Sequence, residues 1–440
     1  MSLVRRLPAV VCALALSVLG VLAVAATAQA SSTPPSFGAP TLLETLAPFA
    51  QGTTGLADLS CGSPTSCVAV GGEFAERTTD AGTATTPVWS AAEVITPSNA
   101  VSVSCPTSSL CLAFADDGTT VRSTDGGMQC SQPVSIETGA QVQNGACTRA
   151  GVCLASGESS FGVGQLYVST DQGQTWSGPD STPNSDAFGS LSCPSNRVCV
   201  ATSLGGDQVL VSTDVGDAGG PTWTATTLSQ SSGSFLTDVS CTANDICVAV
   251  DTLGYAFVST DVSSSSPSWK PMLIVGTGSY GAGLVGLESV SCAERAVDPT
   301  TDLCVTGDFV GSTVISTNVG GTGPSTWSIV PTWDTGVIQS ADGNLLYPIA
   351  CVGTGWCAVA DTGGNVTYAL VPLSDPAGTV WSTPPGTITG ADRMSAVSCS
   401  PNGQSCAALD TTGHAVTSID GGANWSPAAT VDHFDPQGRP

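Results

Sequence analysis

Cysteines are the first residues in this chain that could do chemistry, because most of them occur in close pairs. Five residues separate the two members of six of these pairs. Thiols at such spacings can form disulfides, bind zinc or exchange disulfides with a substrate. Of the 18 cysteines, sixteen form eight pairs, which are Cys61/Cys67, Cys105/Cys111, Cys147/Cys153, Cys193/Cys199, Cys241/Cys247, Cys292/Cys304, Cys351/Cys357 and Cys399/Cys406.

Structural disulfides fit this pattern better than the alternatives. Zinc sites favour two-residue spacings and histidine ligands, whereas the only histidines here are His414 and His433. The sequence contains no Cys-x-x-Cys redox motif. We therefore predict one disulfide within each pair, joining neighbouring strands with Cα atoms roughly 4.4–6.8 Å apart. Each short loop should add about 2–2.5 kcal/mol of stability in the chain-entropy model.

Carboxylates are the second group that could do chemistry. Asp58, Asp238 and Glu288 lie near the starts of strands that we expect to be innermost in the fold, so two of them could face each other across a channel. Two carboxylates a few ångströms apart are sufficient for a glycoside hydrolase. The alternative is that they are solvated polar residues at strand ends.

Two acidic clusters could hold Ca²⁺. They are Asp116-Asp117-Gly118 and the segment from Asp214 to Asp217. Neither supplies a full ladder of oxygen ligands, so both are interpreted as turns. We predict no metal site and no cofactor.

The N-terminal segment has the pattern of an export signal. Arg5 and Arg6 precede an apolar run, and Ala28-Gln29-Ala30 supplies a small-x-small cleavage site. No later stretch approaches the roughly 20 apolar residues needed to span a bilayer. We predict a cleaved signal peptide over residues 1–30 and a secreted protein, a setting in which disulfides persist.

The charge balance is strongly acidic. The formal net charge is −25, and loss of Arg5 and Arg6 with the signal peptide would make it −27. A surface of this charge repels phosphate backbones and anionic membranes. We therefore expect no nucleic-acid partner.

The cysteine pairs mark a structural repeat. Their first members recur every 42 to 59 residues, a period typical of propeller blades. Short apolar runs such as Cys67–Val70 and Leu166–Val168 recur between Gly- and Ser-rich turns, which predicts four short strands per repeat. The scarcity of Lys and Glu disfavours long helices. We predict an all-β chain, a β-propeller of eight four-stranded blades, with seven blades as the alternative.

These repeats set the domain boundaries. We expect an N-terminal linker over 31–39, a single propeller over 40–432 and a C-terminal tail over 433–440. Ring closure is expected to use either Thr41–Leu46 or Ala428–Val431 as an outer strand of a neighbouring blade.

A second motif accompanies the cysteine pairs. The segments Ser169–Trp176 and Ser418–Trp425 fit Ser-x-Asp-x-Gly-x-x-Trp, which resembles the Asp-box, or bacterial neuraminidase, repeat. An Asp in such a turn can accept hydrogen bonds from the next backbone N–H groups, while the Trp packs beneath the hairpin. Looser copies begin at Thr78, Ser212, Ser259, Ser316 and Ser374.

The resemblance implies a propeller with these boxes on its outer rim. Families with such repeats include sialidases, xyloglucan-cleaving glycosidases, sortilin-like receptors and photosystem II assembly factors. They span enzymes, receptors and chaperones, so the shared fold does not choose a function.

Cys130 breaks the pattern. It stands where the other repeats carry Trp, after Ser123-Thr124-Asp125-Gly126-Gly127. We expect an unpaired, buried thiol filling a Trp site, with a reactive thiol as the alternative.

A sialidase is the most specific enzyme hypothesis. By resemblance it would need three arginines that converge on a substrate carboxylate. Arg149, Arg197 and Arg295 lie inside the cysteine-bridged loops, on the face opposite the usual pocket. Arg77 and Arg122 each precede an Asp box, and of all the arginines only Arg393 lies in a loop expected to open onto the pocket face. The triad therefore cannot be assembled.

A binding or scaffold propeller is the preferred interpretation, with a glycoside hydrolase as the alternative. We expect a monomer that recognises an unidentified protein or carbohydrate. Aromatic and acidic residues on irregular loops are typical of recognition surfaces. The candidate ligand-binding residues lie on the links between blades and are Tyr280, Trp333, Asp334, Asp342, Tyr347 and Arg393. The alternative for Trp333 and Tyr347 is that they plug the mouth of the channel.

Overall fold

The computed structural model describes residues between 56 and 430. Residues 82–87, 91–92, 138, 160–162, 181–186, 218–219, 229, 231–232, 276–285, 296–299, 309–310, 332–345, 362–365, 373, 382–393, 401–404, 411–412, 420–424 and 427–428 are excepted. Side chains are not described for 331, 346, 347, 429 and 430. The expected signal peptide, linker and tail lie outside the described residues.

The described chain forms eight antiparallel sheets, and in each sheet the strands follow one another in chain order. The first four sheets, called blades 1–4, contain β1 (Asp58–Cys61), β2 (Cys67–Gly71), β3 (Phe74–Thr78) and β4 (Glu93–Val94); β5 (Ala100–Ser104), β6 (Cys111–Ala115), β7 (Thr119–Ser123) and β8 (Val134–Ser135); β9 (Gln141–Cys147), β10 (Cys153–Glu158) and β11 (Gly164–Ser169); and β12 (Phe188–Ser192), β13 (Cys199–Ser203), β14 (Gln208–Ser212) and β15 (Thr224–Thr227).

Blades 5–8 continue the same pattern. They contain β16 (Leu236–Cys241), β17 (Cys247–Asp251), β18 (Tyr255–Ser259) and β19 (Lys270–Leu273); β20 (Leu287–Glu294), β21 (Asp302–Asp308), β22 (Ser312–Val319) and β23 (Ser328–Pro331); β24 (Leu346–Cys351), β25 (Trp356–Asp361) and β26 (Val366–Leu370), followed by the short 3₁₀ helix η1 (Pro376–Gly378); and β27 (Met394–Cys399), β28 (Cys406–Asp410), β29 (His414–Ser418) and β30 (Ala429–Thr430).

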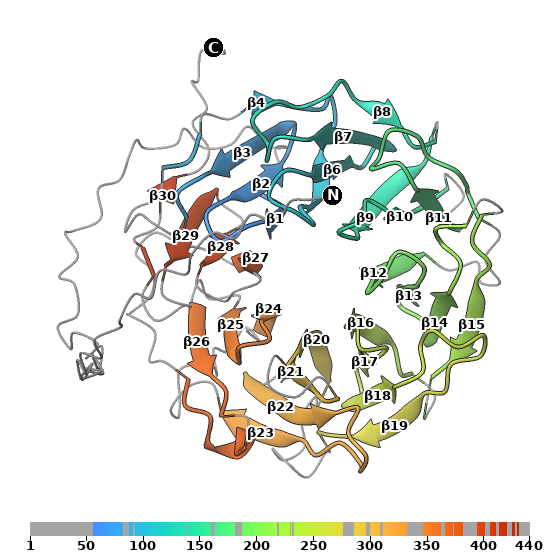
Figure 1. Cartoon of the computed structure of the whole chain (residues 1–440), viewed down its shortest axis with the longest axis vertical. Helices are drawn as coiled ribbons and strands as arrows, with labels where there is room; N and C mark the ends of the chain where they lie inside the picture. The colour runs from blue at the N-terminus through green and yellow to red at the C-terminus, as the bar shows by residue number, and fades with distance from the viewer. Residues whose placement is uncertain are drawn as a thin grey trace, which may run out of the picture. The chain divides into compact units, whose positions relative to one another are not determined.

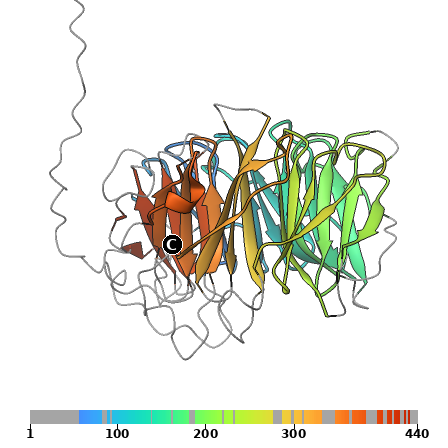
Figure 2. The same cartoon turned by 90° about the horizontal axis from the view of Figure 1, so that it is seen from below.

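The eight sheets stand around a central axis with their first strands innermost (Figure 1) and their strands running side by side along the ring (Figure 2). This confirms the predicted eight-bladed β-propeller over the seven-bladed alternative. Blades 3 and 7 show three named strands among the described residues. In blade 3, the fourth position is a single bridge between Val168 and Ser177.

The ring closes by contact between blade 8 and blade 1. The expectation that Ala428–Val431 completes a neighbouring blade is wrong, because β30 pairs with β29 of its own blade, with His414 opposite Thr430. The Cys61 N–H instead donates to Ser398 Oγ at 3.2 Å. Leu59 and Leu409 share one apolar cluster across this junction. The alternative segment, Thr41–Leu46, lies outside the described residues.

The core lies between the blades. Second strands such as β6, with the sequence Cys-Leu-Ala-Phe-Ala, are buried at every position, because each faces the neighbouring blades on both sides. Eight apolar clusters fill the ring, and each combines residues of two adjacent blades. Blades are therefore stabilised mainly by their neighbours, as is usual for repeat architectures.

All eight predicted disulfides are present, and each joins the first hairpin of one blade. Cys130 is the free cysteine of the described chain, as expected, but it is half-buried and not buried as expected. The bridges are Cys61–Cys67, Cys105–Cys111, Cys147–Cys153, Cys193–Cys199, Cys241–Cys247, Cys292–Cys304, Cys351–Cys357 and Cys399–Cys406.

The predicted Cα separation of these bridges was too long. The observed separations are 4.0–4.2 Å in all eight. The reason is register: pairs such as Cys61/Cys67 and Cys241/Cys247 lie directly opposite each other on adjacent antiparallel strands, where Cα atoms approach most closely.

Cys304 and Cys357 differ from the other second cysteines in their place along the strand. In six blades the second cysteine is the first residue of the second strand, at the edge of the bridged loop. In blades 6 and 7, β21 begins at Asp302 and β25 at Trp356, so Cys304 and Cys357 lie inside their strands. Both remain buried, at 0% and 1% exposed. In blade 6 the reason is that pairing continues beyond the bridge, because Glu294 lies opposite Asp302.

Candidate functional site

The candidate ligand-binding residues fall largely outside the described part of the chain. This applies to Tyr280, Trp333, Asp334, Asp342 and Arg393. For the sixth, Tyr347, the backbone lies in β24 and the side chain is not described. Their role stays a prediction, and what can be examined is the scaffold from which their loops start.

The cysteine-bridged loops and the turns that follow the third strands, called the Ser-x-Asp turns, lie on one face, called the disulfide face below. In blades 1–5 such a turn bonds to the bridged loop of its own blade; for example, Gly126 N–H donates to Ser109 O at 2.8 Å, and Gln172 N–H donates to Gly151 O at 2.9 Å. The hairpins between second and third strands lie at the opposite ends of the sheets, together with the links between blades. This second surface is called the link face.

The Ser-x-Asp turns are folded by their own side chains. In six blades the first hydroxyl donates to the Asp or Asn side chain two residues later, at 2.6–3.0 Å. In blade 3, Asp171 Oδ1 also accepts the N–H groups of Gln174 and Thr175 at 3.0 and 2.9 Å. The side chain of Asp171 therefore accepts hydrogen bonds from its own turn, as expected for a turn-forming motif.

These hydrogen bonds set the pKa values of the aspartates in the turns. Burial raises the pKa of Asp171, but hydrogen bonds from Thr175, Ser169 and Gln174 outweigh it, so the pKa is lowered. The same balance lowers the pKa of Asp214 and Asp261. A pKa held low by donors in its own turn marks a structural carboxylate, since a catalytic acid needs its pKa raised.

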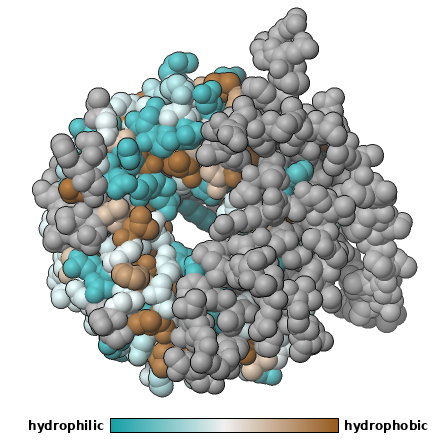
Figure 3. Space-filling model, turned by 180° about the vertical axis from the view of Figure 1, so that it is seen from behind, coloured by the Kyte–Doolittle hydropathy of each residue, from teal (hydrophilic) through white to brown (hydrophobic). Residues whose placement is uncertain are grey.

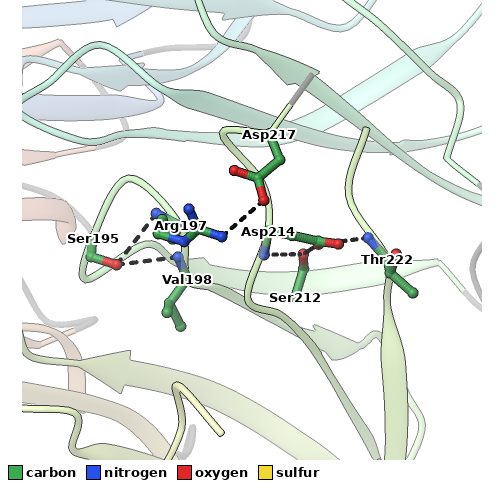
Figure 4. A network of polar contacts seen from close by, with 7 residues as sticks. All are labelled: Ser195, Arg197, Val198, Ser212, Asp214, Asp217 and Thr222. Carbon is green, nitrogen blue, oxygen red and sulfur yellow. Dashed lines mark hydrogen bonds and ion pairs between the residues drawn. The ribbon is translucent and has the colours of Figure 1, made fainter. Parts of the chain in front are cut away.

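Two arginines of the disulfide face, Arg197 and Arg295, are also engaged internally. Arg197 forms an ion pair with Asp217 at 2.8 Å, beside the Ser212–Asp214–Thr222 turn of blade 4 (Figure 4). Arg295 Nη1 donates to Thr317 O at 2.7 Å. These two arginines belong to different blades, and their bonds hold both of them at the disulfide face.

Two of the three candidate catalytic carboxylates clasp adjacent blades. Asp58 Oδ2 accepts Val103 N–H at 2.8 Å and Ser102 Oγ at 3.1 Å. Asp238 makes equivalent contacts four blades further on, where Oδ2 accepts Val290 N–H at 2.8 Å. The interpretation of these acids as solvated strand ends is therefore replaced by an inter-blade role. Glu288 lies in β20 and is partly buried.

Burial shifts the pKa of Asp58 and that of Asp238 in the same direction. Burial is the largest effect and raises the pKa of Asp238 to about 6, against opposing hydrogen bonds from Ser190, Val290 and Val239. The pKa of Asp58 is likewise raised by burial, against bonds from Val103, Leu59 and Ser102. A raised pKa alone would suit a general acid, but every carboxylate oxygen of both residues already accepts a hydrogen bond.

A ladder of serine hydroxyls runs around the inner strands, which the sequence showed only as a recurring Ser-Cys pair. The serine before the first cysteine of one blade accepts the N–H of the matching cysteine in the next blade. Six of the eight junctions have this bond, at 2.9–3.2 Å. The other two junctions carry Ala146 and Ala350 at the serine position.

The link face has a different anchor, which is an acid in blades 5–8; in blade 4 the hydroxyl of Ser203 accepts Gln208 N–H at 3.0 Å at the same position. Blades 5–8 place a buried Asp four residues after the second cysteine, whereas blades 1–4 have Gly71, Ala115, Gly157 and Ser203 there. The acids are Asp251, Asp308, Asp361 and Asp410.

Three of these acids hold the hairpin that follows them. Asp251 Oδ1 accepts Tyr255 N–H at 2.7 Å, and Asp308 Oδ1 accepts Ser312 N–H at 2.7 Å. Asp410 accepts His414 N–H at 2.8 Å and shares a second hydrogen bond, 2.9 Å long, with His414 Nδ1. Sequence reasoning missed these anchors, although the recurring Asp at the end of the second apolar run is their signal.

The surface of the described residues offers few further features. From behind, both hydrophilic and hydrophobic residues border the central opening on the described side (Figure 3). Among the described residues, no group of three or more His, Cys, Asp or Glu is arranged to hold a metal ion. In the same residues, no helix is long and apolar enough to cross a membrane.

Comparisons with known proteins bear on the fold alone. The chain is similar to a structure described as YCF48 bound to D1 peptide, at 17% identity over 70% of this chain and 91% of that chain, with a TM-score of 0.48. It is similar to YCF48 from Cyanidioschyzon merolae at 17% identity over 70% and 94% of the two chains, with a TM-score of 0.47. A structure of U3-55K aligns at 12% identity over 69% and 85%, with a TM-score of 0.49. No family model and no curated protein sequence matches.

Proposed function

We propose that this protein is a secreted, non-catalytic binding propeller that recognises a protein or glycan through its link face. The observation that carries the proposal is the uneven anchoring of that face. Two long links, 274–286 and 332–345, follow β19 of blade 5 and β23 of blade 6, and Asp251 and Asp308 hold the second hairpins of these two blades. Irregular loops on a rigid base are the usual arrangement of a recognition site.

The engagement of the inner carboxylates supports binding over glycoside hydrolysis. Asp58 and Asp238 each use both carboxylate oxygens to hold their own and the next blade. A glycosidase acid or nucleophile must instead present an oxygen to the substrate. The Asp-box assignment is part of the same proposal, because its turns hold the disulfide face internally and leave recognition to the link face.

The test combines a binding screen with a hydrolysis assay. Purified mature protein is screened against sialosides, plant glucans and glycan arrays, and against exported proteins of its host. We expect binding without turnover. Trp333→Ala with Tyr347→Ala should weaken that binding at least tenfold, a loss of about 1.4 kcal/mol, while the unfolding midpoint stays unchanged.

A matched double variant on the disulfide face serves as control. Arg149→Ala with Gln174→Ala removes two exposed side chains there and should leave binding unchanged. Turnover that disappears in Asp238→Asn would establish the glycosidase alternative. Equal losses in both double variants would place recognition elsewhere.

Export and assembly state belong to the same proposal. We expect cleavage after Ala30, a protease-resistant unit over 40–432 and a monomer. Eight disulfides require an oxidising compartment, which supports export. N-terminal sequencing of the exported protein, limited proteolysis and light scattering test these three points, and an unprocessed N-terminus in the exported protein would contradict the first.

A further inference from the structure

Tryptophan indoles fill the slots between blades at the outer rim. The Trp that ends each Asp box packs on the preceding blade, as Trp381 does when its Nε1 donates to Thr313 Oγ1 of blade 6 at 3.0 Å. Trp176 meets Phe114 of blade 2 edge-on, with ring centroids 6.0 Å apart. Trp223 joins the cluster of blades 3 and 4 in the same way.

The slot between blades 1 and 2 has no indole. Cys130 holds the matching backbone position. Its backbone forms an isolated antiparallel β-bridge with Ser123, just as the backbone of Trp89 does with Thr78. A cavity of about 140 Å³ lies there. Its apolar wall comes from both blades and consists of Val68, Val70, Ala75, Ile95, Val103, Ala113 and Val121.

Polar groups line the remainder of this cavity. Glu76 is 3% exposed, whereas Glu93 is exposed and marks the solvent side. Both carboxylates and Arg77 contribute to the lining. Burial raises the pKa of the Cys130 thiol to about 11, with further contributions from the charges of Glu93 and Asp125. The thiol is therefore protonated at neutral pH, and the site suits reversible binding rather than covalent chemistry.

We propose that the slot between blades 1 and 2 binds a small aromatic ring that carries a positive charge. The shape argument is that the same slot holds an aromatic ring elsewhere in this ring of blades. The size argument is that an apolar cavity of about 150 Å³ accommodates benzene. The charge argument is that two carboxylates and one guanidinium line the site, beside Asp125, so that the local potential favours a cation. This site lies apart from the link face and does not rest on the function proposed above.

The few methionines of the chain can report on binding at this site. After removal of Met1, three of the four methionines remain. Met128 lines the cavity and is exposed, Met272 lies in β19 of blade 5, and Met394 is buried in β27 of blade 8. Methyl-¹³C methionine NMR of the full mature chain therefore has one signal at the site and two internal controls.

The probes are benzylamine and benzoate, which share a ring and differ in charge. We expect benzylamine to shift the Met128 methyl signal in a saturable manner and to leave Met272 and Met394 unchanged. Benzoate should bind about tenfold more weakly, a difference of about 1.4 kcal/mol. No saturable shift with benzylamine, or tighter binding of benzoate, overturns the proposal.

Variants of Cys130 locate the effect. Cys130→Ser keeps the cavity and should keep benzylamine binding, whereas Cys130→Trp fills the slot as in the other blades and should abolish it. Cys130→Leu fills the slot partly and replaces the Trp variant if that fails to fold. Glu93→Gln should reduce the preference for benzylamine over benzoate. Undiminished benzylamine binding in the filled variants shows that the ring binds elsewhere, and it overturns the proposal.

Discussion

The inner and outer rims of the propeller hold the same eight blades together by different means. At the inner rim, serine hydroxyls accept cysteine N–H groups from blade to blade, and Asp58 and Asp238 reinforce two of the junctions. At the outer rim, indoles pack on the preceding blade. The inner contacts are polar and directional, whereas the outer contacts depend on buried area and shape.

The two rims compensate for each other. Ala146 and Ala350 interrupt the serine ladder at junctions 3/4 and 7/8, where Trp223 and Trp425 are both buried. The junction without an indole, 1/2, has both the Ser60–Cys105 bond and the Asp58 contacts. Every junction thus keeps at least one of the two devices.

The largest effect should come from removing the indole where the ladder is already interrupted. Trp223→Ala is expected to lower the free energy of unfolding by about 3–5 kcal/mol, because it empties a buried slot. Guanidinium titration measures the change. Trp223→Phe, which keeps a ring, should lose less than half as much. A cost below about 1 kcal/mol for the alanine variant would show that the slot is not needed at this junction.

Removing a disulfide should cost less, because it releases only a short loop. Cys241→Ser with Cys247→Ser is expected to lower stability by about 2–2.5 kcal/mol in the chain-entropy model. Chemical denaturation under oxidising conditions measures it. Cys130→Ser, which removes no bridge, is the control and should change stability little. An equal loss in both variants would refute the assignment.

The Asp238 contact should be worth about 1–3 kcal/mol, because Asp238→Asn replaces an acceptor of Val290 N–H. It also has a pH signature. The folded pKa of about 6 lies above the unfolded value of 3.8, so the folded chain holds an extra proton between those values. Wild-type stability relative to the Asn variant should therefore fall as pH rises from about 4 to about 6.

Asp171→Asn is the matched control with the opposite sign. Its lowered pKa contributes stability that is present above the unfolded value and is lost as pH falls below it. Stability curves from pH 3 to pH 8 for the three proteins measure both trends. Parallel curves for wild type and Asp238→Asn would mean that Asp238 does not titrate in this window.

The smallest effect concerns one rung of the ladder. Ser240→Ala should cost about 1 kcal/mol by leaving Cys292 N–H without its acceptor. Ala146→Ser supplies the hydroxyl that junction 3/4 lacks and should gain up to about 1 kcal/mol. Thermal unfolding of the two variants tests the pair together, and a loss in Ala146→Ser would show that this junction has another geometry.

Much of the fold was predictable because it is repetitive. Cysteine spacing and apolar runs defined eight blades and their disulfides without three-dimensional information. The serine ladder was not predictable, since the Ser-Cys pair is local but its partner lies in the next blade. The roles of Asp58 and Asp238 were not predictable either, because their partners also lie in the next blade. Cys130 was visible as a missing Trp, but only packing shows that a cavity remains beside it.

The candidate site was predicted less completely. Loop position and residue type selected Trp333 and Tyr347, and nothing in the described chain tests them. The buried acids beneath the link face, such as Asp251 and Asp410, were overlooked because single acids at strand ends look like turn residues. Their burial and their bonds to hairpin N–H groups distinguish them.

The short disulfide loops also simplify oxidative folding. Cys241 and Cys247 are six residues apart, whereas cysteines of different blades are several times further away along the chain. Closing a loop about seven times longer costs roughly 1.7 kcal/mol more in chain entropy, so the native partner has an advantage of about twentyfold over a cysteine at that distance. The advantage is smaller for Cys147, which has Cys130 17 residues away, and for Cys292 and Cys304, whose own loop is longer. If the chain is exported as proposed above, each bridge can form as soon as its hairpin emerges, and the sixteen thiols avoid much of the search among wrong pairings before the ring is complete.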